Sequence, residues 1–189
     1  MFANNSLILR LLPISVALSL IIVLSGCQSM MPDEDKKPAY RVELHIDDNL
    51  DFSMEHPEKW PEVPPTVAEY DRLKQSVRWS SVKEGDRQKG ALVTVTSRLP
   101  EEIGGGFPTM VRAYLAEHPR LTLLKQQSFD HPAAPAYELM GTEGTRTLQV
   151  FFLTSPHRAF TLEFSAPTEA FAQFAEIFSE MLLSFRPLS

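Results

Sequence analysis

The C-terminal stretch that sets the fold runs from Ala159 to Phe185 and has the sequence AFTLEFSAPTEAFAQFAEIFSEMLLSF. Over Ala159–Ser165 apolar and polar side chains alternate, which is the two-residue period of a strand with one buried face. After Pro167 apolar side chains recur every three or four residues, as they do on one face of a helix. We therefore predict a strand over Ala159–Ser165 and a helix from about Thr168 to Phe185, with Pro167 at its first turn and its apolar face packed on a sheet.

Most of the chain upstream of this stretch also has strand-like periodicity. The predicted strands are Tyr40–Ile46, Leu50–Met54, Ser76–Val82, Ala91–Arg98, Leu121–Phe129, Ala136–Gly141 and Thr145–Thr154. A further helix is predicted from Pro108 to about Glu117, and Val67–Gln75 fits either a short helix or an irregular loop. Because short connections join consecutive strands, we predict an α+β domain with a mostly antiparallel sheet.

Composition limits the classes of protein to which the chain can belong. Of its 189 residues, 43% are hydrophobic and 22% are charged, which fits one globular domain. Lys and Arg number 18 against 24 Asp and Glu, and the resulting net charge of -6 has the wrong sign for a nucleic-acid-binding surface. The single cysteine, Cys27, excludes an intramolecular disulfide and a cysteine-based metal cage.

The first 26 residues have the layout of a secretory signal peptide: a positive charge at Arg10, an apolar run over Leu11–Leu24 and then small residues. A transmembrane helix is the alternative, but the run is shorter than the ~20 residues that cross a ~30 Å hydrocarbon core. Directly after it, Leu24-Ser25-Gly26-Cys27 resembles the lipobox of bacterial lipoproteins. That resemblance implies cleavage between Gly26 and Cys27 and acylation of Cys27, by palmitate or similar chains, as a lipoprotein membrane anchor.

The predicted division of the chain follows from this signal. Residues 1–26 are the lipoprotein signal peptide, residues 27–39 are the lipidated N-terminus with a polar, proline-containing tether, and residues 40–189 are the globular domain. Position 28 is Gln28, whereas aspartate at that position retains enteric lipoproteins in the inner membrane. The expected location is therefore the periplasm-facing cell envelope, with the outer membrane favoured over the inner membrane.

Two stretches of the predicted domain resemble the PsbP/DcrB-like superfamily. One is FSMEHPEKW over Phe52–Trp60, similar to the family's early strand and its YPxxW turn, and the other is the hairpin and helix that end the chain. Asp51 stands where a glycine is usual, and His56 replaces the aromatic residue. The resemblance implies an antiparallel sheet with helices on both faces, and non-catalytic members that bind protein partners or help to assemble membrane complexes.

No catalytic or metal-binding motif is present in the sequence. His45, Asp47 and Asp48 lie close together, but no pair of histidines has the HExxH or HxH spacing that presents two ligands from one element. No serine lies in a G-x-S-x-G motif, and Cys27 is expected to be acylated. We predict that the protein is not an enzyme and that it needs no metal or other cofactor.

Two features are candidates for a partner surface. Trp60 is surrounded by prolines, and such rigid, aromatic surfaces bind partners at low entropic cost, although a tryptophan that caps the core is the alternative. Gly104, Gly105 and Gly106 precede the predicted helix as an anion-binding loop would, but no Lys-Ser/Thr follows them. A flexible connection at the rim of a partner site is the better interpretation of these glycines.

The expected function is that of a membrane-anchored envelope lipoprotein whose domain binds a protein partner or helps to assemble or maintain an envelope complex. The alternative is a small-ligand carrier or sensor that uses a cleft between the sheet and the loop at 104–108, and an unrecognised hydrolase is a third class. An apolar pocket would favour the carrier, whereas an exposed patch around Trp60 would favour the protein partner.

Overall fold

The computed structural model describes residues 40–64 and 75–188. The predicted signal peptide, the lipidation site at Cys27 and the tether therefore lie outside the described residues, as does nearly all of the uncertain segment Val67–Gln75. None of the helices in the two described ranges has the length and hydropathy that a bilayer crossing requires.

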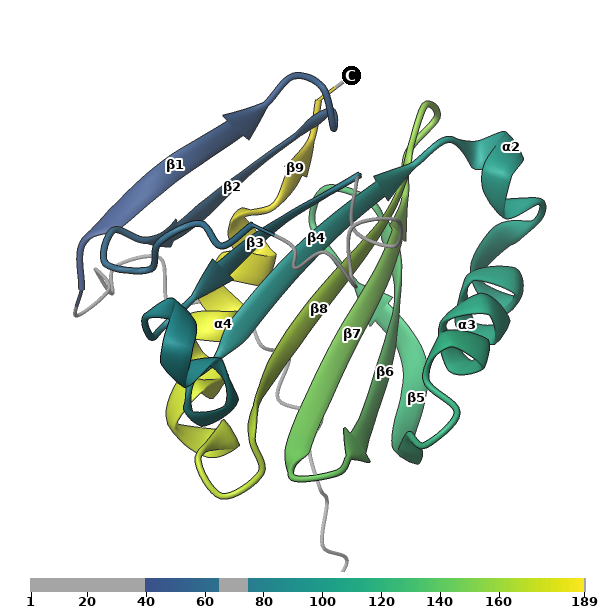
Figure 1. The fold of residues 1–189 in the computed structure, drawn as a ribbon. Coiled ribbons are helices and arrows are strands. Elements are labelled where there is room, and N and C mark those ends of the chain that lie inside the picture. The colour runs from purple at the N-terminus through teal and green to yellow at the C-terminus, as the bar shows by residue number, and fades with distance from the viewer. Residues whose placement is uncertain (1–39, 65–74, 189) are drawn as a thin grey trace, which may run out of the picture. The chain divides into compact units, whose positions relative to one another are not determined.

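A six-stranded sheet forms the centre of the domain (Figure 1). Its strands are β3 (Ser76–Ser80), β4 (Leu92–Arg98), β5 (Thr122–Asp130), β6 (Pro135–Glu143), β7 (Arg146–Thr154) and β8 (Ala159–Pro167). The spatial order is β3-β4-β8-β7-β6-β5, and every neighbouring pair is antiparallel, as predicted. Strand β8 thus joins β4 to β7, which places the last predicted strand in the middle of the sheet.

A second, three-stranded sheet contains β1 (Val42–Asp47), β2 (Phe52–Pro57) and the short C-terminal strand β9 (Arg186–Pro187), in the order β1-β2-β9. The turn between β1 and β2 places Asp51 at φ +58°, the left-handed conformation that favours glycine. Arg158 Nε donates to Asp51 Oδ2 over 2.5 Å, so the turn between β7 and β8 is joined to this hairpin. The sequence analysis did not predict a separate second sheet.

Helices cover both faces of the six-stranded sheet, which confirms the predicted α+β architecture (Figure 1). Helix α4 (Phe171–Ser184) and the three-stranded sheet pack on one face, while α3 (Gly106–Glu117) packs on the other. A short helix, α2 (Pro100–Ile103), precedes α3, and the 3-10 helix η1 (Glu84–Lys89) precedes β4.

Alternation along β8 assigns side chains to the two faces. Phe160, Leu162 and Phe164 are fully buried on the α4 side, where the Phe178 ring lies 5.2 Å from that of Phe164. Each such side chain contributes about 1.5–3 kcal/mol by leaving water. The α3 side has a smaller core that includes Tyr114. The apolar stripe of the C-terminal helix is therefore buried against the sheet, as its period predicted.

Some predicted boundaries were wrong. The last helix begins at Phe171 and not at Thr168, because β8 extends to Pro167 and the next residues form a turn in which the Ala170 N–H donates to the Pro167 carbonyl. Pro167 consequently ends a strand and is not in the first turn of the helix. Helix α3 begins at Gly106, two residues before the predicted start.

Strand β1 has the predicted period, but its apolar side chains face outward. Val42, Leu44 and Ile46 are 40%, 58% and 57% exposed, whereas the His45 ring lies 5.1 Å from the Trp79 ring in the interior. A polar residue thus takes the inward position in a strand whose apolar residues remain in solvent.

Candidate functional site

Helix α3 covers only part of its face of the sheet and leaves a pocket of about 270 Å³ beside it. The pocket lies between strands β3, β4 and β8 on one side and helices α2 and α3 on the other. Over these three strands, the side chains that point toward α3 are mainly polar, in contrast to the apolar residues Leu139, Val150 and Phe152 of β6 and β7. The hollow lies over this half of the sheet because, apart from Ala159 of β8, its side chains on this face give α3 little apolar surface on which to pack.

The floor of the pocket is built from alternate residues of paired strands. Arg78 lies opposite Thr94 in the β3–β4 register, and its Nε donates to Thr94 Oγ1 over 3.2 Å. Thr94 in turn lies opposite Glu163, and Thr96 lies opposite Thr161, in the β4–β8 register. The antiparallel pairing therefore gathers hydroxyls, a guanidinium and a carboxylate on one surface.

A cluster of four ionisable side chains, Tyr114, His118, Glu143 and Glu163, forms the wall beneath α3. Tyr114 donates through its hydroxyl to Glu163 Oε2 over 2.7 Å, and its ring stacks on that of His118 with centroids 4.2 Å apart. His118 Nδ1 is 3.0 Å from Glu143 Oε2, and its Nε2, 3.9 Å from Glu163 Oε2, is buried with no hydrogen-bond partner among the described residues. These contacts hold the wall in one arrangement before any ligand arrives.

The rim combines charged and apolar groups. Arg98 at the end of β4 pairs with Glu117 of α3 over 3.6 Å, and Glu102 accepts a hydrogen bond from the Leu99 N–H over 3.2 Å. The apolar part of the lining comes from Ile103, Met110, Ala113 and Ala159. The lining thus contains both signs of charge and favours a ligand with several polar groups over a purely apolar one.

The glycine run lies next to this pocket. Gly104, Gly105 and Gly106 connect α2 to α3, and all three have positive φ values of 58°, 131° and 55°. A Cβ on Gly104 would meet no atom within 4 Å, while Ile103 before the run and Thr109 three residues after it line the pocket. The glycines therefore stand at the rim of a pocket, in the position that the sequence analysis assigned to a partner site or cleft, although they do not line it themselves.

Trp60 is not part of an exposed surface. Its side chain is 7% exposed, and its ring lies 6.1 Å from that of Phe174 and 6.4 Å from that of Phe178. The alternative interpretation, a tryptophan that closes the core beside the proline-rich segment, matches this placement. The suggested partner surface at Trp60 is corrected accordingly, because α4 covers the ring.

The histidines of the domain serve structural contacts. His45 Nε2 is 3.9 Å from Asp47 Oδ2, but no group of three potential metal ligands occurs within residues 40–64 and 75–188. His56 is buried and stacks on Trp79 at 4.9 Å, and this burial lowers the pKa of its imidazole. His131, another of the scattered histidines considered as metal donors, is also buried with a lowered pKa, because desolvation outweighs its hydrogen bond to the Leu182 carbonyl.

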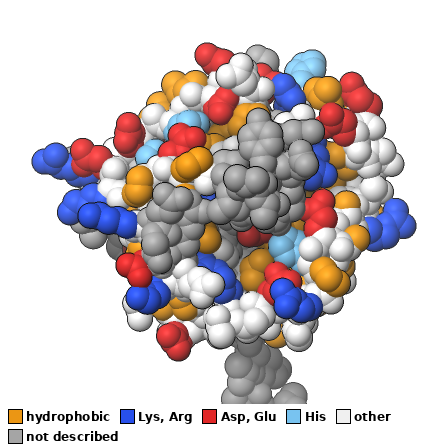
Figure 2. Space-filling model, in the orientation of Figure 1, with side chains coloured by type: hydrophobic (Ala, Val, Ile, Leu, Met, Phe, Trp, Pro, Cys, Tyr) orange, Lys and Arg blue, Asp and Glu red, His pale blue; other side chains and the backbone are white. Residues whose placement is uncertain are grey.

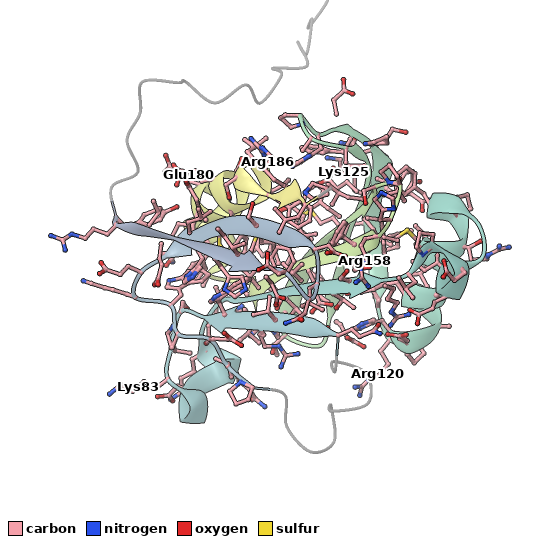
Figure 3. The ribbon with its side chains drawn as sticks, turned by 90° about the horizontal axis from the view of Figure 1, so that it is seen from above. Lys83, Arg120, Lys125, Arg158, Glu180 and Arg186 are labelled. Carbon is pink, nitrogen blue, oxygen red and sulfur yellow. The ribbon has the colours of Figure 1, made fainter. Side chains whose placement is uncertain are left out.

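Charge on the surface is mixed. Figure 2 shows acidic and basic side chains interspersed over the visible face. The labelled cations Lys83, Arg120 and Lys125 lie on different sides of the domain (Figure 3). On the face that Figure 2 shows, the described residues therefore form no broad basic surface, in agreement with the net charge of -6.

The pocket residues were missed from the sequence, although a signal was present. The strand ALVTVTSR over Ala91–Arg98 alternates apolar Val93 and Val95 with polar Thr94 and Thr96. That pattern marks a polar face, but the pocket exists only because β3 and β8 present similar faces beside it. The order of the strands is needed to recognise the site.

Comparisons with known proteins identify the fold. No protein-family model and no curated protein matches the chain. The solution structure of cyanobacterial PsbP (CyanoP) from Synechocystis sp. PCC 6803 aligns with a TM-score of 0.55 at 13% identity, over 77% of this chain and 92% of that chain. The crystal structure of LpqN, involved in cell envelope biogenesis of Mycobacterium tuberculosis, aligns with a TM-score of 0.53 at 11% identity, over 73% of this chain and 83% of that chain. At these identities the likeness shows a PsbP-like fold.

Proposed function

We propose that the chain is a lipid-anchored cell-envelope protein whose PsbP-like domain is non-catalytic and binds a protein partner at the pocket between α3 and strands β3, β4 and β8. The pocket is the observation that carries this proposal. An envelope role is supported by the likeness to LpqN, a protein of similar fold involved in cell envelope biogenesis.

The anchor rests on the N-terminal sequence. Residues 1–26 would be removed, Cys27 would carry the lipid, and residues 27–39 would tether the domain at 40–189 within ~40 Å of the bilayer. Acyl chains on Cys27 supply ~0.8 kcal/mol for each buried methylene, so two or three chains anchor the protein stably. Gln28 favours the outer membrane as the destination.

The size and lining of the pocket favour a side chain or short segment of a partner protein. Its volume of about 270 Å³ is close to the lower end of the ~300–1,000 Å³ typical of small-molecule sites. Its polar groups are already oriented by hydrogen bonds such as Tyr114 to Glu163, so little ordering entropy is lost when a partner enters. Hydroxyl, guanidinium and carboxylate groups together suit a polar or charged anchor residue.

A non-catalytic role fits the chemistry of the lining. The described residues that line the pocket include no serine or cysteine, so a hydroxyl nucleophile would have to be a threonine or Tyr114, whose hydroxyl already donates to Glu163. Glu163 is engaged by the Tyr114 hydroxyl, and His118 by Glu143, which are contacts that fix the wall. This arrangement is that of a recognition surface, in which polar groups are held in place to meet complementary groups.

The proposal is tested by photo-crosslinking in cells. A photoreactive residue replaces Thr109 at the pocket rim of the full chain, and a second chain carries it at Glu169, which is exposed near the start of α4. Ala113→Trp obstructs the pocket from an exposed position on α3, and Ala116→Trp adds the same side chain to an exposed α3 position outside the lining. We expect one protein adduct from position 109 that is lost with Ala113→Trp and kept with Ala116→Trp. The proposal would be contradicted if position 169 gave the same adduct in the same yield as position 109, or if Ala113→Trp did not reduce the adduct from position 109.

A small polar ligand is the second candidate, because the pocket lies between the sheet and the loop at 104–108, where the carrier alternative requires a cleft. Native mass spectrometry of the full chain distinguishes it. A bound small mass that Ala113→Trp removes and Ala116→Trp retains would favour the carrier over the protein partner.

A further inference from the structure

Strand β1 is the edge of the three-stranded sheet, and its outer side has no neighbouring strand among the described residues (Figure 1). The Glu58 N–H donates to the Arg41 carbonyl over 3.0 Å, so the backbone of Arg41 faces β2. Backbone groups alternate in direction along an antiparallel strand. The N–H and C=O groups of Val42, Leu44 and Ile46 therefore point away from β2, toward the open edge.

The side chains of the same three residues form an apolar row on the solvent face of β1. Val42, Leu44 and Ile46 are 40%, 58% and 57% exposed. Natural edge strands are commonly protected by charged side chains, lysine above all, by proline or by a bulge. Strand β1, with the sequence VELHID, contains no proline or lysine and pairs with β2 without a register shift, and its charged residues Glu43 and Asp47 alternate with the apolar row. This edge is therefore suited to pairing with another strand.

We propose that β1 pairs antiparallel with β1 of a second copy of the chain, with Leu44 of the two copies on the twofold axis. Val42 then lies opposite Ile46 of the second copy, and Leu44 lies opposite itself. All outward N–H and C=O groups of these three residues meet complementary groups, since each belongs to a hydrogen-bonded pair in this register. The apolar row continues across the interface, and the contact is isologous, as a closed dimer requires.

The charges on the opposite face of β1 select this register. With Leu44 on the axis, Arg41 lies opposite Asp47 of the second copy, and Glu43 lies opposite His45. A shift of two residues in one direction places Glu43 opposite Glu43, and a shift in the other direction places Glu43 opposite Asp47. Like charges directly opposite one another are destabilising, so of these three registers only the Leu44-centred one places a cation, Arg41, opposite an anion, Asp47, with no like-charged pair. Larger shifts leave at least half of β1 without a β1 partner.

The interface is small, because it consists of one pair of strands and lies well below the ~1,600 Å² of a standard protein interface. A weak dimer is therefore expected, and disulfide trapping detects such a dimer better than a measurement of molecular mass in solution. The surface at β1 includes none of the residues that line the pocket, so failure of one proposal leaves the other standing.

Disulfide trapping of the purified full chain in detergent tests the register. Directly opposed residues of a hydrogen-bonded antiparallel pair have Cα atoms about 5.5 Å apart, within the ~4.4–6.8 Å range of disulfides. Leu44→Cys is expected to form a covalent dimer on mild oxidation. Val42→Cys alone is not expected to form a covalent dimer, because the two copies of that position are about 13 Å apart along the strands. A mixture of Val42→Cys and Ile46→Cys chains is expected to form the covalent heterodimer. The parent chain, with Cys27 alone, gives the background.

Charge variants provide the second arm. In the Leu44→Cys chain, Arg41→Glu places a negative charge opposite Asp47 of the second copy. This repulsion should lower the rate of covalent dimer formation by about fivefold. Adding Asp47→Asn removes the repulsion and should restore the rate, while asparagine keeps the side-chain oxygen that accepts the Asn49 and Leu50 N–H groups. No dimer from a folded Leu44→Cys chain, equal trapping by Val42→Cys, or no effect of Arg41→Glu would each overturn the proposal.

Discussion

His131 ties the link between β5 and β6 to the end of α4, and its replacement should weaken the fold in a pH-dependent way. Its Nε2 donates to the Leu182 carbonyl over 2.8 Å, and its Nδ1 accepts from the Ala133 N–H over 3.1 Å. The two contacts require a neutral ring with its proton on Nε2. Burial lowers the pKa of His131, and nearby Arg186 lowers it further, while the Leu182 carbonyl raises it.

His131→Phe keeps a ring of similar size and removes both hydrogen bonds. Each contributes ~0.5–1.5 kcal/mol, and the Leu182 carbonyl still accepts from the Phe185 N–H, so the expected cost is about 2 kcal/mol near pH 7.5. For a domain of this size that cost corresponds to a fall in Tm of roughly 4–8 °C. His157→Phe, at an exposed position in the turn between β7 and β8, is the matched control and should change little.

The pH dependence has a definite sign. The folded-state pKa of His131 lies below its ordinary value of 6.5, so the unfolded chain binds a proton that the folded chain excludes. The contribution of His131 to the free energy of unfolding is fully present above pH 6.5 and decreases as the pH falls toward its lowered folded-state pKa. Urea unfolding near pH 7.5 and near pH 5.5 should therefore show a smaller acid-induced loss in His131→Phe than in the parent chain, with buried His56 accounting for part of the remainder. A variant as stable as the parent at the higher pH, or with an undiminished acid-induced loss, would refute this reasoning.

Three further predictions concern the core, a turn and the anchor. Trp60→Ala should lower the free energy of unfolding in urea by about 3–5 kcal/mol, because its ring packs under α4, and a loss below about 1 kcal/mol would contradict this burial. Asp51→Gly should be more stable to urea than Asp51→Ala by about 1 kcal/mol, since both lose the Arg158 contact but only alanine is strained at φ +58°; equal stabilities would count against the turn geometry. Cys27→Ala should accumulate as unprocessed precursor without lipid by mass spectrometry of membrane fractions, whereas normal maturation of that variant would sink the proposed anchor.

Local periodicity was sufficient to predict most elements. The stripe of phenylalanines in α4 and the alternation in β8 each depend on a few neighbouring residues, so they predicted both the element and its buried side. The ends of α4 were less certain, because Pro167 suits both the first turn of a helix and the end of a strand. Asp51 adopts the left-handed conformation although it is not a glycine, since aspartate tolerates that region better than most residues.

The pocket and the β1 edge needed the three-dimensional structure. Thr94 and Glu163 are far apart in sequence, and they share the pocket floor because β8 returns to pair with β4. For β1, alternation predicted a strand with two unlike faces, but it could not show that His45 would turn inward and Leu44 outward. Which face of β1 is buried depends on the residues of other elements that pack against it, such as Trp79, and the sequence of the strand itself does not specify them. The same limit applied to Trp60, whose burial depends on α4 at the other end of the chain.

The most direct test of partner binding at the pocket is calorimetric titration of the crosslinked protein, once identified and purified, against the full chain and its two α3 tryptophan variants. We predict that Ala113→Trp weakens binding by about tenfold or more, equivalent to about 1.4 kcal/mol, whereas Ala116→Trp binds as the parent chain does. Equal affinities for the parent chain and Ala113→Trp would contradict the assignment of this pocket as the binding site.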